Sequence, residues 1–262
     1  MRDFEDRIVL VTGGATGLGA AIAAGAAKRG AKAVIVNYSK SAKEADATAD
    51  LVRSAGAEAI LAKGDVAEDA DCRAVAAAAE KFGRIDALAN NAGITKQSPN
   101  HADLDALSKD DFLRLYAVNT VGPYMMLRAA RPLLEAAGRA SVLMTSSIAG
   151  ITGIGSSVAY VASKGALNAM TLALARALAP KIRVNALCPG FIDTRWFSDP
   201  FGEEAAQRIR ESIARNTPLQ VASKPEDIAD AALFFLSESS RHVTGETLLV
   251  DAGLHLGQQP RA

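Results

Sequence analysis

The stretch RIVLVTGGATGLGAAIA, residues 7–23, joins a short apolar run to a glycine-rich turn and then to an alanine-rich segment. An apolar run of this length, bounded by a turn, is typical of a buried strand, so residues 7–12 are predicted as strand and 18–29 as helix. Glycines at 13, 14, 17 and 19 would let backbone N–H groups approach a pyrophosphate at the N-terminus of that helix. This segment predicts the first unit of a nucleotide-binding α/β fold.

The spacing of these glycines narrows the nucleotide class. Gly13-x-x-x-Gly17-x-Gly19 differs from the G-x-G-x-x-G pattern, and the Gly-Lys-Ser/Thr ending of a phosphate-binding loop is missing, which argues against an ATPase. Glycine-rich turn chemistry alone is the alternative at this point. A second glycine cluster at 150–155 has no helix directly after it, and we therefore expect a flexible loop there.

Apolar strands and helical patterns alternate along the rest of the chain. Continuous apolar strands between helices indicate a parallel sheet covered on both faces, hence a single-domain Rossmann-type doubly wound α/β fold of about seven strands over 1–262. Ser41 and Glu44 fit a capping box. Segment 191–216 is the least regular and is predicted as a substrate-binding loop or lid. The further predicted strands are 33–37, 58–63, 85–90, 140–146, 182–187 and 247–250, and the further helices lie from 41, at 68–82, 110–137 and 158–179.

Composition restricts the partners. Among 262 residues, 29 basic and 29 acidic residues cancel, which gives no electrostatic case for nucleic acid or an anionic membrane. Acidic residues precede the first apolar run, which argues against a signal peptide, and no stretch is expected to span a membrane. Cys72 and Cys188 lie far apart and are predicted as reduced thiols of a cytoplasmic protein. The scattered histidines, His101, His242 and His255, suggest no metal site.

The helix that begins with AYVASKGALNAM, residues 159–170, carries a tyrosine and a lysine in an otherwise apolar stretch. Tyr160 and Lys164 are four residues apart and so share one helix face. An amphipathic edge would explain the pair without chemistry. Alternatively, the cation would lower the pKa of the phenol and suit it to general acid/base catalysis near neutrality.

Several motifs together resemble the short-chain dehydrogenase/reductase family. These are TGGATGLG at 12–19, NNAG at 90–93, a serine thirteen residues before YVASK, and CPG at 188–190. The match runs to TGETLLVDAG at 244–253 and is most similar to the β-ketoacyl-carrier-protein reductase or glucose-dehydrogenase-like branch. The resemblance implies NAD(P)-dependent hydride transfer between a carbonyl and a secondary alcohol.

The resemblance also assigns roles to residues. Tyr160 is the implied acid/base, Lys164 lowers its pKa and holds the nicotinamide ribose, and Ser147 hydrogen-bonds the substrate carbonyl. Asn119 supports a proton relay to the lysine, although a polar residue that merely completes a backbone bond is the alternative. The implied cofactor contacts are Gly13, Thr16, Gly17, Leu18, Gly19, Asn37, Tyr38, Ser39, Lys40, Asp65, Val66, Asn91, Ala92, Gly93, Tyr160, Lys164, Pro189, Gly190, Ile192 and Thr194.

The substrate stays open at this level. A 3-oxoacyl thioester, a sugar and another alcohol are all compatible with the family. Arg128 and Arg131 would receive an acidic carrier protein, or are simply solvated. Phe191, Trp196, Phe197 and Phe201 are predicted to supply apolar pocket walls.

Other functional classes fit the motifs less well. An epimerase or dehydratase of the broader superfamily would be longer and use another glycine spacing. A non-catalytic nucleotide-sensing protein would have lost part of the Ser-Tyr-Lys set, and an enoyl reductase would have a wider Tyr-to-Lys spacing.

The end of the second strand bears on the choice of cofactor. The family's NAD-selecting acid would fall on Asn37 or Tyr38, and neither is charged. Ser39 and Lys40 follow and predict a preference for NADP over NAD, whereas Thr16 is not the basic residue that many NADP-using relatives have. Helical regions 110–137 and 158–179, apolar on more than one face, predict a homotetramer.

Overall fold

The computed structural model describes residues 2–196 and 202–257 and contains one parallel sheet in the order β3-β2-β1-β4-β5-β6-β7. The prediction of a doubly wound α/β fold with about seven strands is therefore confirmed. The strands are β1 Ile8–Val11, β2 Ala33–Tyr38, β3 Glu58–Lys63, β4 Ala87–Asn90, β5 Ala140–Thr145, β6 Ile182–Pro189 and β7 Thr247–Val250. The helices are α1 Gly17–Lys28, α2 Ala42–Ser54, α3 Asp69–Ala77, α4 Lys109–Tyr116, α5 Gly122–Ala136, α6 Ala149–Thr152, α7 Val158–Leu178, α9 Glu203–Asn216 and α10 Pro225–Leu236.

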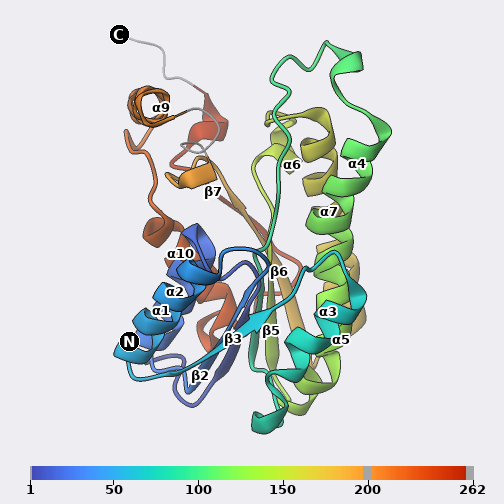
Figure 1. Ribbon diagram of the computed structural model, residues 1–262, viewed down its shortest axis with the longest axis vertical. Coiled ribbons are helices and arrows are strands. Elements are labelled where there is room, and N and C mark those ends of the chain that lie inside the picture. The colour runs from blue at the N-terminus through green and yellow to red at the C-terminus, as the bar shows by residue number, and fades with distance from the viewer. Residues whose placement is uncertain (1, 197–201, 258–262) are drawn as a thin grey trace.

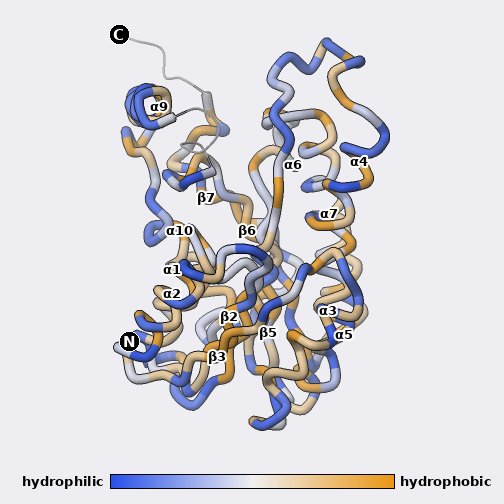
Figure 2. The backbone as a smooth tube through the Cα atoms, in the orientation of Figure 1, coloured by the Kyte–Doolittle hydropathy of each residue, from blue (hydrophilic) through white to orange (hydrophobic). Residues whose placement is uncertain are grey.

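Helices cover both faces of the sheet (Figure 1). One apolar core joins α1 and α10 to the sheet and includes Ile22 and Phe235. The other joins α3, α5 and α7 to the opposite face and includes Val75 and Met126. All four residues of β1 are buried, as a central parallel strand requires. Figure 2 shows the hydrophobic colours concentrated on the strands and on the helix faces that meet them.

The sheet reverses its strand order beside β1. This strand pairs with β2 on one side and β4 on the other, with Val9 in register with both Val34 and Ala87. Ligands bind to such sheets at the carboxyl ends of the strands, where the order reverses. The segments that follow β1, β4 and β5 carry the glycine-rich turn, Asn91 and Ser147, so the fold brings these motifs to one edge.

Three local predictions were wrong. Ser41 makes no side-chain capping bond, and Glu44 pairs with Arg195 instead of closing a capping box. The predicted helix 68–82 ends at Ala77 and is followed by a 3₁₀ turn at Glu80–Phe82. The cluster at 150–155 is partly helical, since α6 covers Ala149–Thr152. The described part of segment 191–216 includes helix α9, and its role as a substrate-binding loop or lid stays a prediction.

The sequence predicted no stretch that could span a membrane, and helix α7 departs from this prediction. Among the described residues it is one helix of sufficient length and apolarity to span a bilayer. Its buried side, however, packs on the sheet and carries Lys164, and a third of its apolar window is buried. An exposed apolar side that includes Leu172 remains, which bears on the assembly considered below.

Candidate active site

The glycine-rich turn forms a cradle into which side chains would not fit. Gly13 and Gly17 have φ of +59° and +53°, a region that L side chains rarely adopt. A Cβ on Gly13 would lie 2.9 Å from the Ala92 Cα, and one on Gly19 would lie 2.2 Å from the Gly13 carbonyl oxygen. Glycine is therefore required here for backbone conformation and for close packing of α1 under the turn, and not only for flexibility.

Two buried side chains hold this turn in place. The Thr12 hydroxyl accepts hydrogen bonds from the backbone N–H groups of Asn91 and Ala92, at 2.9 Å and 3.1 Å. The Asn37 side chain accepts from the Gly13 N–H at 3.3 Å and donates to the carbonyls of Ala62 and Gly64 at 3.1 Å and 3.0 Å. The polar atoms of the Asn37 side chain therefore hold the neighbouring loops together. Both Asn37 and Tyr38 line the pocket.

The N-terminus of α1 faces this turn and suits an anion. Its N-cap residue, Thr16, is extended and makes no side-chain capping bond, so the first helical N–H groups remain available to a phosphate. Lys164 donates from Nζ to the Thr145 carbonyl at 2.8 Å, which uses one of three ammonium protons. The Thr145 hydroxyl at the same place is buried and has no hydrogen-bond partner among the described residues. These open donors fit the pyrophosphate and the ribose of a nicotinamide dinucleotide.

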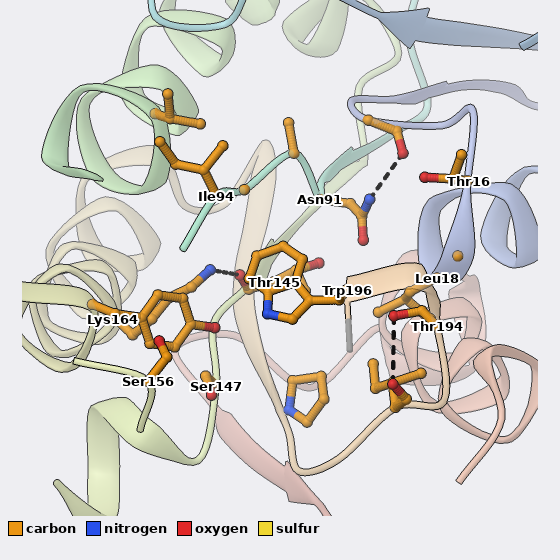
Figure 3. Close-up of a pocket in the computed structure, with 18 of the residues that line it drawn as sticks. Thr16, Leu18, Asn91, Ile94, Thr145, Ser147, Ser156, Lys164, Thr194 and Trp196 are labelled. Atoms are coloured by element: carbon orange, nitrogen blue, oxygen red, sulfur yellow. Dashed lines mark hydrogen bonds between the residues drawn. The ribbon is translucent and has the colours of Figure 1, made fainter. Parts of the chain in front are cut away.

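The catalytic candidates come from the end of β5 and the first turns of α7. Ser157 caps α7 by accepting from the Tyr160 N–H at 3.2 Å, which fixes the start of the helix and thereby the position of the phenol. Ser147 follows β5, and Figure 3 shows it beside Ser156 and Lys164. The Lys164 Nζ lies 5.7 Å from the centre of the Tyr160 ring. The amphipathic-edge alternative is therefore set aside, because both side chains face the pocket.

Burial dominates the electrostatics of the pair. It raises the pKa of Tyr160 to about 12, while a hydrogen bond with Ser147 acts in the opposite direction. Burial also lowers the pKa of Lys164 to about 8. The expectation that the pKa of the phenol is lowered is not met in the chain alone, because desolvation raises it. At neutral pH the phenol is protonated and most of the lysine is charged.

Asn119 lies behind the pocket. It is fully buried in a π-helical turn, Ala117–Val121, that separates α4 from α5. Its side chain accepts from the Ile94 N–H at 2.9 Å and donates to the Ile94 carbonyl at 3.0 Å and to the Ser163 hydroxyl at 3.1 Å. The side chain therefore fixes the loop after β4 to α7. A π-turn is frequent at functional positions, and it interrupts the helix predicted over 110–137.

One cavity of about 830 Å³ is lined by most of the predicted residues. Gly19 and Asn119 do not line it, since the first packs under the turn and the second braces a loop. Phe191 and Trp196 line it, while Phe197 and Phe201 lie outside the described residues. The predicted residues at its wall are Gly13, Thr16, Gly17, Leu18, Asn37, Tyr38, Ser39, Lys40, Asp65, Val66, Asn91, Ala92, Gly93, Ser147, Tyr160, Lys164, Pro189, Gly190, Ile192 and Thr194.

Sequence reasoning missed part of the wall. Further lining residues come from the loop after β4, from α4, from the loop before α7, from α9 and from the C-terminal segment: Ile94, Gln97, Arg114, Thr145, Ser156, Ile209, Ile213 and Leu254. Thr145 offered a signal, because it lies near the end of the predicted strand 140–146 and two residues before Ser147. Ile209 and Ile213 lie within segment 191–216, which was predicted to bind substrate, although neither was singled out. Leu254 offered no signal, since only the folded chain brings the C-terminal segment to the cleft.

Comparisons with known proteins agree with this geometry. A family model described as Enoyl-(Acyl carrier protein) reductase matches residues 13–255. A protein named ketoacyl reductase 2 of the granaticin polyketide synthase of Streptomyces violaceoruber is 39% identical over 255 residues, with 96% of this chain and 97% of that protein covered. An L-rhamnose 1-dehydrogenase (NAD(P)(+)) of a Sphingomonas strain is 36% identical, covering 99% and 100%. A crystal structure from Burkholderia xenovorans, described as a short-chain dehydrogenase/reductase, has a TM-score of 0.87 and 40% identity, covering 96% and 98%.

The fold and the site thus define a nicotinamide-dependent oxidoreductase. The chain belongs to the short-chain dehydrogenase/reductase family. Its relatives include both a ketoacyl reductase and a sugar dehydrogenase, whose names match two of the three substrate classes that the sequence left open.

Proposed function

We propose that this enzyme reduces a ketone with an apolar body, using NADPH in preference to NADH, and that Tyr160 is the proton donor. The observation that carries the proposal is the hydroxyl of the half-buried Tyr160 on Ser147, within the same cavity as the glycine cradle. Its raised pKa of about 12 keeps the phenol protonated at neutral pH, and that is the form needed to reduce a carbonyl.

The residues around the carbonyl have distinct tasks. A bound reduced nicotinamide supplies the hydride. The Ser147 hydroxyl donates a hydrogen bond to the substrate carbonyl oxygen and sets its position, and the Tyr160 hydroxyl donates the proton that converts this oxygen to an alcohol. The Lys164 ammonium, 5.7 Å from the ring centre, stabilises the phenolate that remains. Asn119 keeps the Ile94 loop against α7, so that these groups stay aligned.

The lining favours a ketone with an apolar body over a sugar. Side chains from several elements give the substrate side an apolar surface: Ile94, Ile154, Phe191, Trp196, Ile209, Ile213 and Leu254. An aldose would lose hydrogen bonds to water there without replacement, at a cost of about 1–3 kcal/mol for each buried hydroxyl. The identity with an L-rhamnose dehydrogenase keeps sugar oxidation as the second candidate.

The NADPH preference rests on the end of β2. Ser39 and Lys40 line a smaller cavity beside the main one, together with Lys63. Neither lysine forms an ion pair with a described residue. The carboxylates of Asp65 and Asp71 at this cavity accept the N–H groups of Ala67 and Asp65. Two free ammonium groups next to the adenosine end of the cleft favour a 2′-phosphate.

We further propose a cytoplasmic homotetramer that acts on a small molecule and binds neither nucleic acid nor membrane. Both cysteines are free and buried, and burial raises the pKa of each thiol, which keeps them unreactive. Exposed apolar residues on α4, α5 and α7, namely Leu113, Tyr124 and Leu172, support burial of these helices between subunits.

The test is turnover by the purified enzyme with each nicotinamide against acetoacetyl thioesters, cyclic ketones and aldoses. We expect ketone reduction with a higher kcat/KM for NADPH, and a smaller NADPH advantage in Lys40→Ala. Lys28→Ala, on the last turn of α1 and outside the cavity lining, is the matched control. Preference for NADH, or an advantage unchanged in Lys40→Ala, would contradict the cofactor assignment. Aldose oxidation without ketone reduction would contradict the substrate assignment.

A further inference from the structure

The only tryptophan of the chain stands next to the reacting hydroxyl. The Trp196 and Tyr160 rings meet edge to face, with centroids 6.4 Å apart and an interplanar angle of 61°. Trp196 lines the cavity but remains 37% exposed. Figure 3 shows its indole among the side chains that line the pocket. A substrate whose carbonyl oxygen is bound by Tyr160 would therefore have its neighbouring atoms beside the Trp196 indole. This ring is large, apolar and only partly covered by the protein.

The wall formed by the loop before α7 is held rigidly. The Ser98 N–H donates to the Ser156 carbonyl at 2.7 Å, and the His101 Nε2 meets the Gly155 carbonyl at 3.0 Å. The hydroxyls of Thr95 and Ser156 form a hydrogen bond with each other. Fewer hydrogen-bond donors and acceptors on this wall therefore remain for a substrate. In Figure 3, Ser156 and Trp196 appear on either side of Ser147. A fixed wall and an indole thus flank the catalytic serine.

The charged groups around this cleft argue against a strongly anionic carrier. Lys96 pairs with Asp111 at 3.3 Å, Arg195 with Glu44 at 2.7 Å, and Arg210 with Asp193 at 2.8 Å. The two arginines considered for an acidic carrier protein are also paired, as Arg128 bonds Asp69 and Arg131 bonds Glu135. Lys40 and Lys164, which also line the cavity, are assigned above to the cofactor and to proton transfer. Apart from these two, Arg114 is the lining cation that has no ion pair with a described residue, so this wall offers a substrate at most one site for an anionic group.

From these contacts we infer that the substrate is a ring-bearing ketone with a flat aromatic portion, which packs against Trp196 while its carbonyl lies on Tyr160 and Ser147. The inference rests on the proposed carbonyl reduction and names its substrate class. A planar ring covers the exposed indole and gains the interaction of an aromatic pair in addition to apolar burial. A linear acyl chain gains only the burial.

Two ketones of the same skeleton separate these contributions. 2-Tetralone carries an aromatic ring that is not conjugated with its carbonyl, and trans-2-decalone is its saturated counterpart. The measured quantity is the ratio of their kcat/KM values with NADPH, compared between the wild type and variants, so that intrinsic reactivity cancels. We expect Trp196→Leu to lower the tetralone advantage about 3- to 10-fold, the range of an aromatic pair, and Trp196→Phe to retain part of it.

The matched control is Phe234→Leu, which removes an aromatic ring of similar exposure, 40%, on α10 outside the cavity lining. It should leave the ratio unchanged. A binding readout is independent of turnover: with NADP⁺ present, 2-tetralone should quench the emission of Trp196 saturably, and trans-2-decalone should quench it less. An unchanged ratio in Trp196→Leu, equal quenching by both ketones, or a wild-type preference for an acetoacetyl thioester over 2-tetralone would overturn the inference. Absence of all ketone turnover would instead contradict the proposed function.

Discussion

Gly19→Ala tests whether the glycine turn is a built cradle. The new Cβ would lie 2.2 Å from the Gly13 carbonyl oxygen and 2.6 Å from the Asn91 Nδ2, and the first of these neighbours is backbone that must move. Moving it breaks the 3.2 Å hydrogen bond from Asn91 to that carbonyl. Overpacking costs about 1–3 kcal/mol and the lost hydrogen bond about 1 kcal/mol. For a chain of this size, that total lowers Tm by about 5–15 °C.

The same displacement moves the N–H groups that would bind the cofactor phosphates. We therefore expect NADPH affinity to fall about 10- to 100-fold, measured by fluorescence titration, with Tm followed by circular dichroism. Gly165→Ala is the control, because it lies in α7 and its new Cβ would meet only the Gly150 carbonyl oxygen, at 3.7 Å. Alanine in a helix interior should stabilise by about 0.5–1 kcal/mol. A Gly19→Ala variant with the Tm and NADPH affinity of the wild type would refute the reasoning.

Three further predictions concern catalysis and assembly. Tyr160→Phe should fold and bind NADPH but lose at least about 10²-fold in kcat, since it cannot donate the proton; retention of more than a tenth of the rate would contradict its role. The pKa of Lys164 is lowered to about 8, so the charge of its ammonium is present below that pH and lost above it. We therefore expect kcat for reduction to be level near pH 7 and to fall about tenfold per pH unit well above pH 8. A profile that stays flat to pH 10 would show that the ammonium is not needed. Light scattering should report a tetramer, and a species of 27.2 kDa alone would exclude it.

The strands and the catalytic set were predictable because their signals are local. Short apolar runs between helices indicate strands of a parallel sheet, so β3 and β7 were predicted with the bounds that the structure has, although both lie at the edges of the sheet and are only partly buried. Tyr160 and Lys164 lie on one helix, where a spacing of four fixes their relation whatever the tertiary structure. Local patterning therefore defined both the sheet and the helix face that carries the chemistry.

The rest depends on contacts that no local pattern contains. The π-turn at Asn119 arises because its side chain bonds the backbone of Ile94, a residue 25 positions earlier. The role of Trp196 depends on its contact with Tyr160, from another element. The pKa of Tyr160 was expected to fall because the lysine was visible in the sequence, whereas the burial that raises it follows from packing.

Neighbouring positions at the end of β2 allow the cofactor assignment to be tested by a matched pair of variants. Tyr38 lines the cleft and lies in register with Lys63, so Tyr38→Asp places a carboxylate next to the expected 2′-phosphate. Charged hydrogen bonds contribute about 1.5–3 kcal/mol, and the NADPH-to-NADH ratio of kcat/KM should therefore fall about 10- to 150-fold. Asn37→Asp should act differently, because its Nδ2 donates to two carbonyl oxygens that a carboxylate would repel. That variant should lower Tm by several degrees and weaken both cofactors alike. If Asn37→Asp instead switches the preference at unchanged Tm, Asn37 is the residue that reads the ribose and the bracing role assigned to it is wrong.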